Sequence, residues 1–382
     1  MHILFVNYHH LDSNSGIHIF NLANQLSSLG VKCTVCVPNQ KESADILGKR
    51  VFDLFNFDET KHVLQAGQVD LVHAWTPREG VRLMTEALVE QLNVPYLVHL
   101  EDNEEAILEA NLGITISELL DLPETRLNRM IPEHLSHPVR YKQFLKKARG
   151  LTMLIDTLQD FGPDNEAKEM IWPGYEESLP WNRPLDESLR QRLNIDPDEY
   201  VVVYTGNVHH ANHQEVFSLY LAVGLLNRNG VRTRLIRTGT DYVPLYDENL
   251  RMLDQYCVSL GHVPRTDLPA ILSIASALVQ PGKADTFNRY RFPSKLPEYL
   301  ASGKPVLLPH ANIGRILRNE EEAIILKQGN ALEIAQTLEA LFPDRTRCER
   351  IGAGGRQFAE KNLRWQKSAE KLMNYYNRLL IY

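Results

Sequence analysis

Short apolar runs recur along the first part of the chain and alternate with amphipathic stretches. The apolar runs are residues 2–7, 31–38, 69–73, 94–100 and 151–155. Each has the length and composition of a buried strand. Residues 16–29 and 81–92 instead place apolar side chains at helical spacing, and the first of these stretches ends at Gly30. Apolar strands that alternate with helices predict a parallel sheet that helices cover on both faces.

A second series of the same kind begins at residue 200. Its predicted strands are residues 200–206, 233–239, 276–281 and 304–309. A helix is predicted at residues 215–227, and the Pro-rich residues 170–196 lack periodicity and form a linker. The fold class is therefore α/β, with two doubly wound domains at residues 1–172 and 173–363. The helical pattern of residues 364–382 has no strand after it, so we expect this helix to cross back to the N-terminal domain.

The composition is that of a folded protein. The chain has 382 residues, of which 43% are hydrophobic, and its formal charge of −7 has the wrong sign for a protein that wraps nucleic acid. No basic segment precedes a long apolar run at the N-terminus, and no uncharged run is long enough to span a bilayer. We therefore expect a cytoplasmic protein.

Cys33 and Cys36 form a C-x-x-C pattern, but they lie inside the predicted strand at residues 31–38. A redox pair needs a helix N-terminus that stabilises its thiolate. The pattern therefore predicts two buried, reduced thiols.

Ligands of open parallel sheets bind outside the carboxyl ends of the strands, so the loops after the strands carry the candidate chemistry. The loop at residues 7–16 leads into a helix at Gly16 and lacks G-x-G-x-x-G, which argues against a dinucleotide site. The next loop carries His99, Glu101 and Asp102. Strand alternation puts His99 and Glu101 on one side, and we predict catalytic roles for these three residues.

Three histidines in five positions follow the strand that starts at residue 200. The loop holds Gly206, Asn207, His209 and His210, but no acidic or Cys ligand that would complete a metal site. We expect no metal here. Gly206 would let the backbone approach a ligand, and Asn207 and the imidazoles would offer it hydrogen bonds.

The richest loop lies between residues 280 and 306. Ser294 is a preferred N-cap residue and Gly303 a preferred stop, so a short helix is predicted between them. Arg291 and Lys295 would place two cations beside its N-terminus, where backbone N–H groups favour a diphosphate. Glu298, in the first turn, could accept hydrogen bonds from a ribose diol, or it could simply complement the helix dipole.

The basic segment at residues 140–149 has two interpretations. Its apolar side chains share one face of a helix, surrounded by Lys and Arg. This face could rest on an anionic membrane surface, which would make the protein peripheral on the cytoplasmic membrane face, or it could face the core and leave a solvated basic side.

Residues 293–306 resemble the P-x-K-x-x-E-Y-x-A-x-G-x-P-V signature of the retaining glycosyltransferases of family 4, also called group 1, which have the GT-B fold. Gly261-His-Val-Pro before Asp267 is similar to the nucleobase loop of that family, and the resemblance covers nearly the whole chain. It implies two Rossmann-like domains facing a central cleft. It also implies transfer of a sugar from a nucleotide diphosphate sugar, UDP-linked, to a saccharide or lipid-linked acceptor, as in surface polysaccharide and exopolysaccharide biosynthesis.

The resemblance also implies roles for single residues and no metal or other cofactor. The backbone of Val263 would contact the base, Glu298 would hold the ribose, Lys295 and Arg291 would neutralise the diphosphate, and His99 would approach the transferred sugar. The full predicted donor site is Gly16, Gly206, Asn207, His209, Arg237, Val263, Asp285, Asn288, Arg291, Ser294, Lys295 and Glu298.

Two departures from the family pattern keep other functions open. Tyr290 stands where the family has the first Glu of its E-x7-E pair, so Asp285 or Asn288 would have to replace it. Asn207, His209 and His210 replace the usual Arg and Lys, which would leave the diphosphate to Lys295, Arg291 and Arg237. The alternatives are a nucleotide-sugar epimerase of the same fold and a non-catalytic binding subunit.

Overall fold

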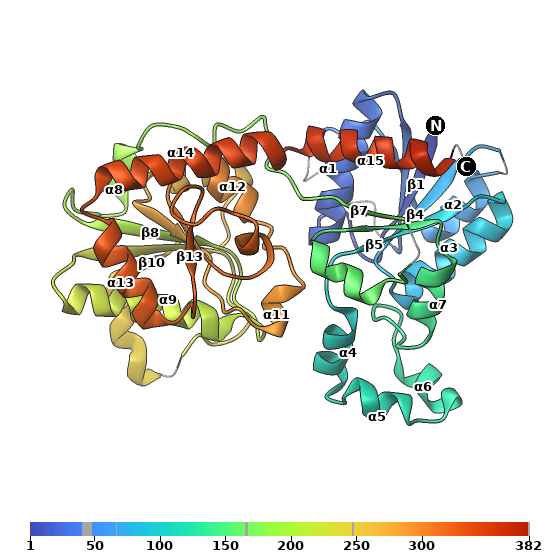
Figure 1. Cartoon of the computed structure of the whole chain (residues 1–382), viewed down its shortest axis with the longest axis horizontal. Helices are drawn as coiled ribbons and strands as arrows, with labels where there is room; N and C mark the ends of the chain where they lie inside the picture. The colour runs from blue at the N-terminus through green and yellow to red at the C-terminus, as the bar shows by residue number, and fades with distance from the viewer. Residues whose placement is uncertain (40–47, 66, 165–166, 247, 381–382) are drawn as a thin grey trace. The chain divides into compact units, whose positions relative to one another are not determined.

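The computed structural model describes residues 1–39, 48–65, 67–164, 167–246 and 248–380. The chain divides into two compact units. The first unit comprises Met1–Pro173, Tyr290–Phe292 and Trp365–Tyr382, and the second comprises Gly174–Arg289 and Pro293–Arg364. Each unit is an α/β structure built on its own parallel sheet (Figure 1).

The first unit holds a seven-stranded parallel sheet of order β3-β2-β1-β4-β5-β6-β7. The strands are β1 (His2–Val6), β2 (Lys32–Val37), β3 (Asp53–Asn56), β4 (Leu71–Trp75), β5 (Tyr96–Leu100), β6 (Gly150–Met153) and β7 (Lys168–Met170). The helices are α1 (Asn14–Ser28), α2 (Phe57–Val63), α3 (Glu79–Leu92), α4 (Glu104–Leu112), α5 (Ile116–Leu120), α6 (Glu124–Met130), α7 (Arg140–Lys147) and α15 (Trp365–Leu380), with a 3-10 turn at η2 (Asp156–Phe161). Every residue of β1, β4 and β5 is buried, as expected for strands covered on both faces.

The C-terminal helix α15 is part of the first unit, as the sequence predicts. It lies beside α1 (Figure 1), and Trp365, Leu372 and Tyr376 pack into the same core cluster as residues of β1 and β2. Helices α4, α5 and α6 form a smaller cluster of their own around Leu108 and Leu119, after the carboxyl end of β5.

The second unit holds a six-stranded parallel sheet of order β10-β9-β8-β11-β12-β13. The strands are β8 (Tyr200–Thr205), β9 (Thr233–Thr238), β10 (Cys257–Ser259), β11 (Ala277–Val279), β12 (Val306–Pro309) and β13 (Ile324–Leu326). The helices are α8 (Glu187–Arg192), α9 (His213–Arg228), α10 (Leu268–Ser273), α11 (Thr286–Arg289), α12 (Leu296–Ala301), α13 (Ala331–Leu341) and α14 (Arg345–Asn362), with 3-10 turns at η3 (Glu248–Tyr256), η4 (Arg265–Asp267) and η5 (Asn312–Arg315).

Two predictions about local structure are settled by burial. Cys33 and Cys36 are buried in β2, and burial raises the pKa of each thiol to about 12, so both are inert free thiols. In α7, Tyr141, Phe144 and Leu145 are buried, so its apolar face belongs to the core and its lysines form a solvated basic side. The interpretation in which the apolar face of α7 rests on a membrane is therefore wrong.

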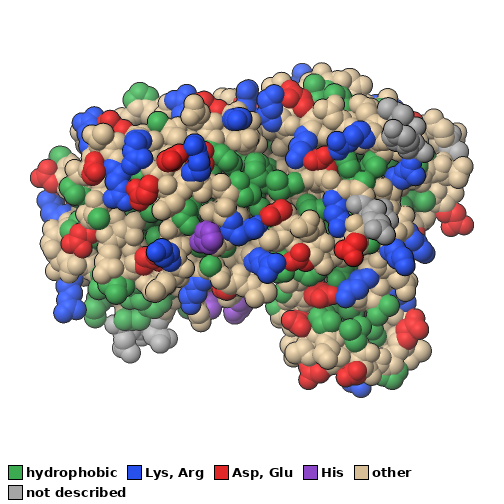
Figure 2. All heavy atoms as spheres, in the orientation of Figure 1, with side chains coloured by type: hydrophobic (Ala, Val, Ile, Leu, Met, Phe, Trp, Pro, Cys, Tyr) green, Lys and Arg blue, Asp and Glu red, His purple; other side chains and the backbone are tan. Residues whose placement is uncertain are grey.

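The described surface is mixed in charge. On the face drawn in Figure 2, Lys and Arg side chains alternate with Asp and Glu. Among the described residues, no helix combines the length and apolar character needed to cross a membrane.

Candidate functional site

In the first unit, His99 lies at the carboxyl end of β5 and is fully buried. Its ring stacks on the indole of Trp75, the last residue of the neighbouring strand β4, with centroids 3.8 Å apart and planes 23° apart. Its Nδ1 lies 2.7 Å from Oγ1 of Thr152 on β6. Burial lowers the pKa of His99 to about 3, so the ring is neutral near pH 7.

Glu101 follows β5 and is held by side chains from two elements of the first unit, α1 and β4. It accepts hydrogen bonds from Ser15 of α1 and from the indole nitrogen of Trp75, the latter at 2.8 Å. His18 Nδ1 lies 3.2 Å from its Oε1. Burial by itself would raise the pKa of Glu101, but His18, His99 and Ser15 together lower it to about 2. Glu101 is therefore ionised near pH 7 and holds a proton only at low pH, which makes it a weak general base.

Asp102 differs from its neighbour because its pKa is raised. Burial makes the largest contribution, and the charges of Glu101 and Glu104 add to it, which brings the pKa to about 6. The pKa of Asp102 therefore lies much closer to neutrality than the pKa of Glu101.

The other acidic residues of this loop have structural partners. Glu104 accepts from Arg78 at 3.2 Å and from Ser136 at 2.8 Å, and the guanidinium of Arg78 lies 3.9 Å from the ring centroid of Tyr8. Glu105 accepts from Tyr141 at 2.7 Å.

Gly16 lies in the first turn of α1 and is explained by packing. A Cβ at this position would overlap the backbone carbonyls of His10 and Leu11, so the loop after β1 closes tightly only over a glycine. The side chain of Ser13, one turn earlier, caps the helix by accepting from the Gly16 N–H at 3.1 Å.

In the second unit, Gly206 and Lys295 meet at the carboxyl end of β8. Gly206 has a φ of +144°, and a Cβ there would lie 2.7 Å from the Lys295 amine. The same amine lies 4.0 Å from the ring centroid of Tyr204. The hydroxyl of Tyr299, from α12, accepts the Thr205 N–H at 2.6 Å and so ties α12 to the end of β8. A cation and a glycine thus lie together where ligands of parallel sheets bind.

Glu298 lies in the first turn of α12 and is 6% exposed. It forms an ion pair with Arg265, whose Nε also lies 3.2 Å from Glu176. Burial raises the pKa of Glu298, against the lowering effect of Arg265. The sequence offered no sign of Glu176 and Arg265, because their importance comes from contacts distant in sequence.

Two predicted donor residues are engaged within their own loop. Oδ1 of Asn207 accepts the Thr240 N–H at 2.8 Å. The His209 N–H donates to Asn212 at 2.9 Å, and His209 Nδ1 accepts from Ala211 at 3.3 Å. These contacts shape the loop after β8 and engage Oδ1 of Asn207 and Nδ1 of His209. The predicted role of the two residues toward a ligand stays a prediction.

Arg237 is buried and pairs with Asp241, with Nη2 2.6 Å from Oδ2. Its role toward a diphosphate stays a prediction, and a bound diphosphate would have to share Arg237 with Asp241. Asn288 is also buried, and its amide donates to Glu215 at 2.6 Å, while Asp285 accepts the Asn288 N–H at 2.9 Å. Asp285 therefore caps the turn at α11.

Three other predicted residues have the following positions. Ser294 is exposed and is not the N-cap, because α12 begins one residue later than predicted and Lys295 takes the cap position without a side-chain hydrogen bond. Val263 is half-buried in the loop between β10 and η4. Arg291, with Tyr290, belongs to the short segment that groups with the first unit.

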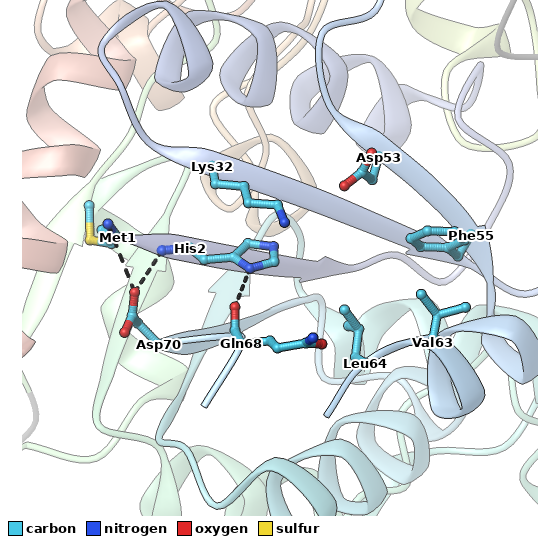
Figure 3. Close-up of a pocket in the computed structure, with 9 residues that line it drawn as sticks. All are labelled: Met1, His2, Lys32, Asp53, Phe55, Val63, Leu64, Gln68 and Asp70. Carbon is cyan, nitrogen blue, oxygen red and sulfur yellow. Dashed lines mark hydrogen bonds and ion pairs between the residues drawn. The ribbon is translucent and has the colours of Figure 1, made fainter. Parts of the chain in front are cut away.

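Within the described residues, no three His, Cys, Asp or Glu side chains are grouped as a metal site would need. A pocket of about 530 Å³ does occur in the first unit, lined by His2, Lys32, Asp53 and Gln68 among others (Figure 3). These residues lie at or near the amino ends of β1, β2, β3 and β4, which is the edge of the sheet opposite to His99. His2 is held there by Gln68 and Thr34.

Comparison with known proteins agrees with this architecture. Residues 199–344, which belong to the second unit except for Tyr290–Phe292, match the family model described as Glycosyl transferases group 1. Among curated proteins, none matches the chain.

Solved structures resemble the chain over its whole length. Anabaena Alr3699/HepE in complex with UDP-glucose is 14% identical with a TM-score of 0.71, over 99% of this chain and 100% of that one. Sucrose-phosphate synthase from Thermosynechococcus elongatus is 15% identical with a TM-score of 0.69, over 100% and 99%. WaaG, a glycosyltransferase involved in lipopolysaccharide biosynthesis, is 14% identical with a TM-score of 0.62, over 96% and 98%. The predicted GT-B fold is confirmed.

Proposed function

We propose that this protein transfers a sugar from a nucleotide diphosphate sugar, uridine-linked, to a saccharide or lipid-linked saccharide acceptor. The observation that carries the proposal is the group 1 glycosyltransferase match over residues 199–344. That segment contains Lys295, whose amine lies at the carboxyl end of β8, and Glu298 in the first turn of α12. UDP or UDP-glucose occupies structures of Alr3699/HepE, which share the fold of this chain. These complexes favour uridine over other bases.

Lys295 supplies the positive charge for the diphosphate, and Gly206 lets that diphosphate approach the backbone. Glu298 accepts from the ribose hydroxyls. Because Arg265 pairs with Glu298, a bound nucleotide must share or displace this ion pair. Cations and backbone dipoles then stabilise the leaving diphosphate, and the reaction proceeds without a metal ion.

The proposed stereochemistry is retention. The acceptor hydroxyl oxygen forms the new bond to the anomeric carbon on the face from which the diphosphate oxygen leaves. The acceptor proton passes to that diphosphate oxygen, so the products are the glycoside and the nucleoside diphosphate. Retention needs no protein base. This is consistent with a neutral His99 and with Glu101, whose low pKa makes it a weak base. An inverting reaction would instead need a base, and Asp102 is its best candidate because of its raised pKa.

The proposal is tested first by a thermal-shift panel of UDP, GDP, ADP and their sugar conjugates, with and without EDTA. A bound nucleotide raises the unfolding temperature by mass action. We expect UDP and one UDP-sugar to stand out, with the shift unchanged by EDTA and lost in Lys295→Ala. A shift that disappears with EDTA contradicts metal independence, and no shift with any nucleotide favours the non-catalytic alternative.

The product then separates the remaining alternatives. Incubation of the preferred donor with a panel of saccharide acceptors should give a glycoside whose anomeric configuration, read by NMR, matches that of the donor. An inverted product overturns retention. An isomerised nucleotide sugar formed without any acceptor identifies an epimerase instead.

A further inference from the structure

Four buried side chains from four elements of the first unit form a hydrogen-bonded row that ends at His99. The Tyr376 hydroxyl, from α15, lies 2.7 Å from Nδ1 of His73 on β4. Nε2 of His73 lies 2.9 Å from Oγ1 of Thr152 on β6, and the same Oγ1 lies 2.7 Å from Nδ1 of His99. All four side chains are fully buried.

The hydrogens of this row can be assigned by counting. A hydroxyl and a neutral imidazole each carry one hydrogen for donation. Burial lowers the pKa of His73 well below its usual value and raises that of Tyr376 well above its usual value, so the imidazole is neutral and the phenol keeps its proton. Within the described part of the chain, the Tyr376 hydroxyl has His73 as its hydrogen-bond partner and no other.

The phenol therefore donates to Nδ1 of His73, which places the His73 hydrogen on Nε2. That N–H donates to Thr152, whose hydroxyl hydrogen must then point to Nδ1 of His99. Consequently His99 carries its hydrogen on Nε2. The opposite order would leave two buried groups unpaired, the Tyr376 O–H and the acceptor nitrogen Nε2 of His99, whereas the assigned order leaves one, the His99 Nε2–H, and is therefore favoured.

We propose that Tyr376 is a positioning residue that fixes His99 in its Nε2–H tautomer through His73 and Thr152. His99 then meets a ligand as a hydrogen-bond donor and is unable to act as a general base. Its Nε2 is buried and has no hydrogen-bond partner among the residues that the structure describes. An acceptor oxygen brought beside it on binding would satisfy it, and the identity of that oxygen as a hydroxyl of the transferred sugar rests on the proposed function.

The tautomer is measured directly by NMR on the full chain labelled with ¹⁵N-histidine, with the His99 signals assigned by their loss in His99→Gln. In the wild type we expect a protonated, pyrrole-type Nε2 and an unprotonated, pyridine-type Nδ1 at His99. Tyr376→Phe keeps the ring but removes the hydroxyl, so either order of the row leaves one His73 nitrogen unpaired. We expect a second His99 population, protonated on Nδ1, to appear in this variant.

The chain offers a matched control one residue away. Tyr375 lies on the same helix, is 2% exposed, and donates to the carbonyls of Ala167 at 2.6 Å and Leu151 at 3.1 Å, outside the row. Tyr375→Phe should leave the His99 tautomer unchanged. A wild-type His99 protonated on Nδ1, or identical His99 spectra in Tyr376→Phe and the wild type, overturns the proposal.

Thr152 provides a second test at the centre of the row. Thr152→Val is nearly isosteric but cannot relay a hydrogen bond, whereas Thr152→Ser keeps the hydroxyl. The valine variant should show mixed His99 tautomers and the serine variant the wild-type one. If Tyr376→Phe fails to fold, the two Thr152 variants still test whether the row sets the His99 tautomer. Mixed His99 tautomers in both variants would contradict the proposal.

Sugar transfer supplies a readout that depends on the proposed function. Tyr376→Phe should lower kcat about fivefold, the equivalent of one neutral hydrogen bond, with KM little changed, and Tyr375→Phe should not. The NMR result needs no substrate. The expected tautomers in a chain without transferase activity would therefore support the relay and refute the proposed function, whereas unchanged tautomers in an active Tyr376→Phe enzyme refute the relay alone.

Discussion

The indole of Trp75 stacks on the imidazole of His99 and also donates its N–H to Glu101. One buried side chain thus links the two residues that the sequence selects at the end of β5. A lowered Glu101 pKa and a neutral His99 occur side by side because Glu101 takes its hydrogen bonds from Ser15 and Trp75 and pairs with His18. His99 adds only an electrostatic contribution, and its own pKa is lowered by burial.

Trp75→Phe should separate these two contacts. Phenylalanine keeps an aromatic face for His99, but it leaves a cavity and removes one donor from a charged, buried Glu101. We expect the free energy of unfolding to fall by about 2–4 kcal/mol and sugar transfer to slow. Chemical denaturation followed by circular dichroism, together with initial rates, measures both. The control Tyr96→Phe removes one hydrogen bond, to the Phe144 carbonyl at 2.8 Å, at the other end of β5, and should preserve the rate.

His73 and His99, the buried histidines of the hydrogen-bonded row, predict that the folded state loses stability in acid. Burial lowers the pKa of His73 and of His99, so the unfolded chain binds more protons than the folded chain between the folded pKa and about 6.5. Stability therefore falls as the pH drops below about 6.5, and each histidine contributes up to about 1.4 kcal/mol per pH unit.

His73→Gln should reduce this slope by about 1.4 kcal/mol per pH unit, measured by urea unfolding at about pH 7, 6 and 5. His62→Gln, at an exposed position of α2, is the matched control and should keep the wild-type slope. Equal slopes in the wild type and His73→Gln would show that His73 is not held neutral by burial.

Apolar continuity made the inner strands predictable. Strands β1, β2, β4, β5, β6 and β8 are buried along nearly all their length, and each appears in the sequence as an apolar run. The strands that the sequence analysis missed are β3, β7, β10 and β13, which are short edge strands of the two sheets. Two of them, β3 and β7, mix polar with apolar residues, and β10 and β13 are only three residues long. Such strands give little signal of their own, and tertiary pairing decides their structure.

The candidate site was predictable only at the level of which loops matter. The sequence places His99 near a strand end and Lys295 and Glu298 at the start of a short helix. It does not show that Arg237 is paired with Asp241 or that Glu298 is paired with Arg265. The Tyr376 to His99 relay was equally invisible, because its members come from four separate elements and none lies in a motif. Pairing of this kind is set by packing and cannot be derived from spacing along the chain.

Gly206→Ala should displace the Lys295 amine. A methyl group there would lie 2.7 Å from Nζ, and the φ of +144° adds backbone strain. We expect the affinity for UDP, measured by calorimetry, to fall about tenfold or more, because a charge-assisted contact is lost. Gly230→Ala is a close control, because Gly230 also has a positive φ, +86°, but nothing lies within 4 Å of its Cβ position. Equal UDP affinities in the two variants would show that Lys295 does not bind the diphosphate.

Glu298 can be tested with a nucleotide that lacks its proposed partner. If Glu298 accepts from the ribose, UDP should bind the wild type about tenfold or more tightly than 2′,3′-dideoxy-UDP, because hydrogen bonds to a charged group are worth about 1.5–3 kcal/mol. Glu298→Ala should remove this preference by weakening UDP binding while leaving the dideoxy compound unaffected. The control is Glu176→Ala, which takes the other carboxylate from Arg265 and should keep the preference. A preference that survives in Glu298→Ala would mean that Glu298 serves to hold Arg265, and that the ribose is bound elsewhere.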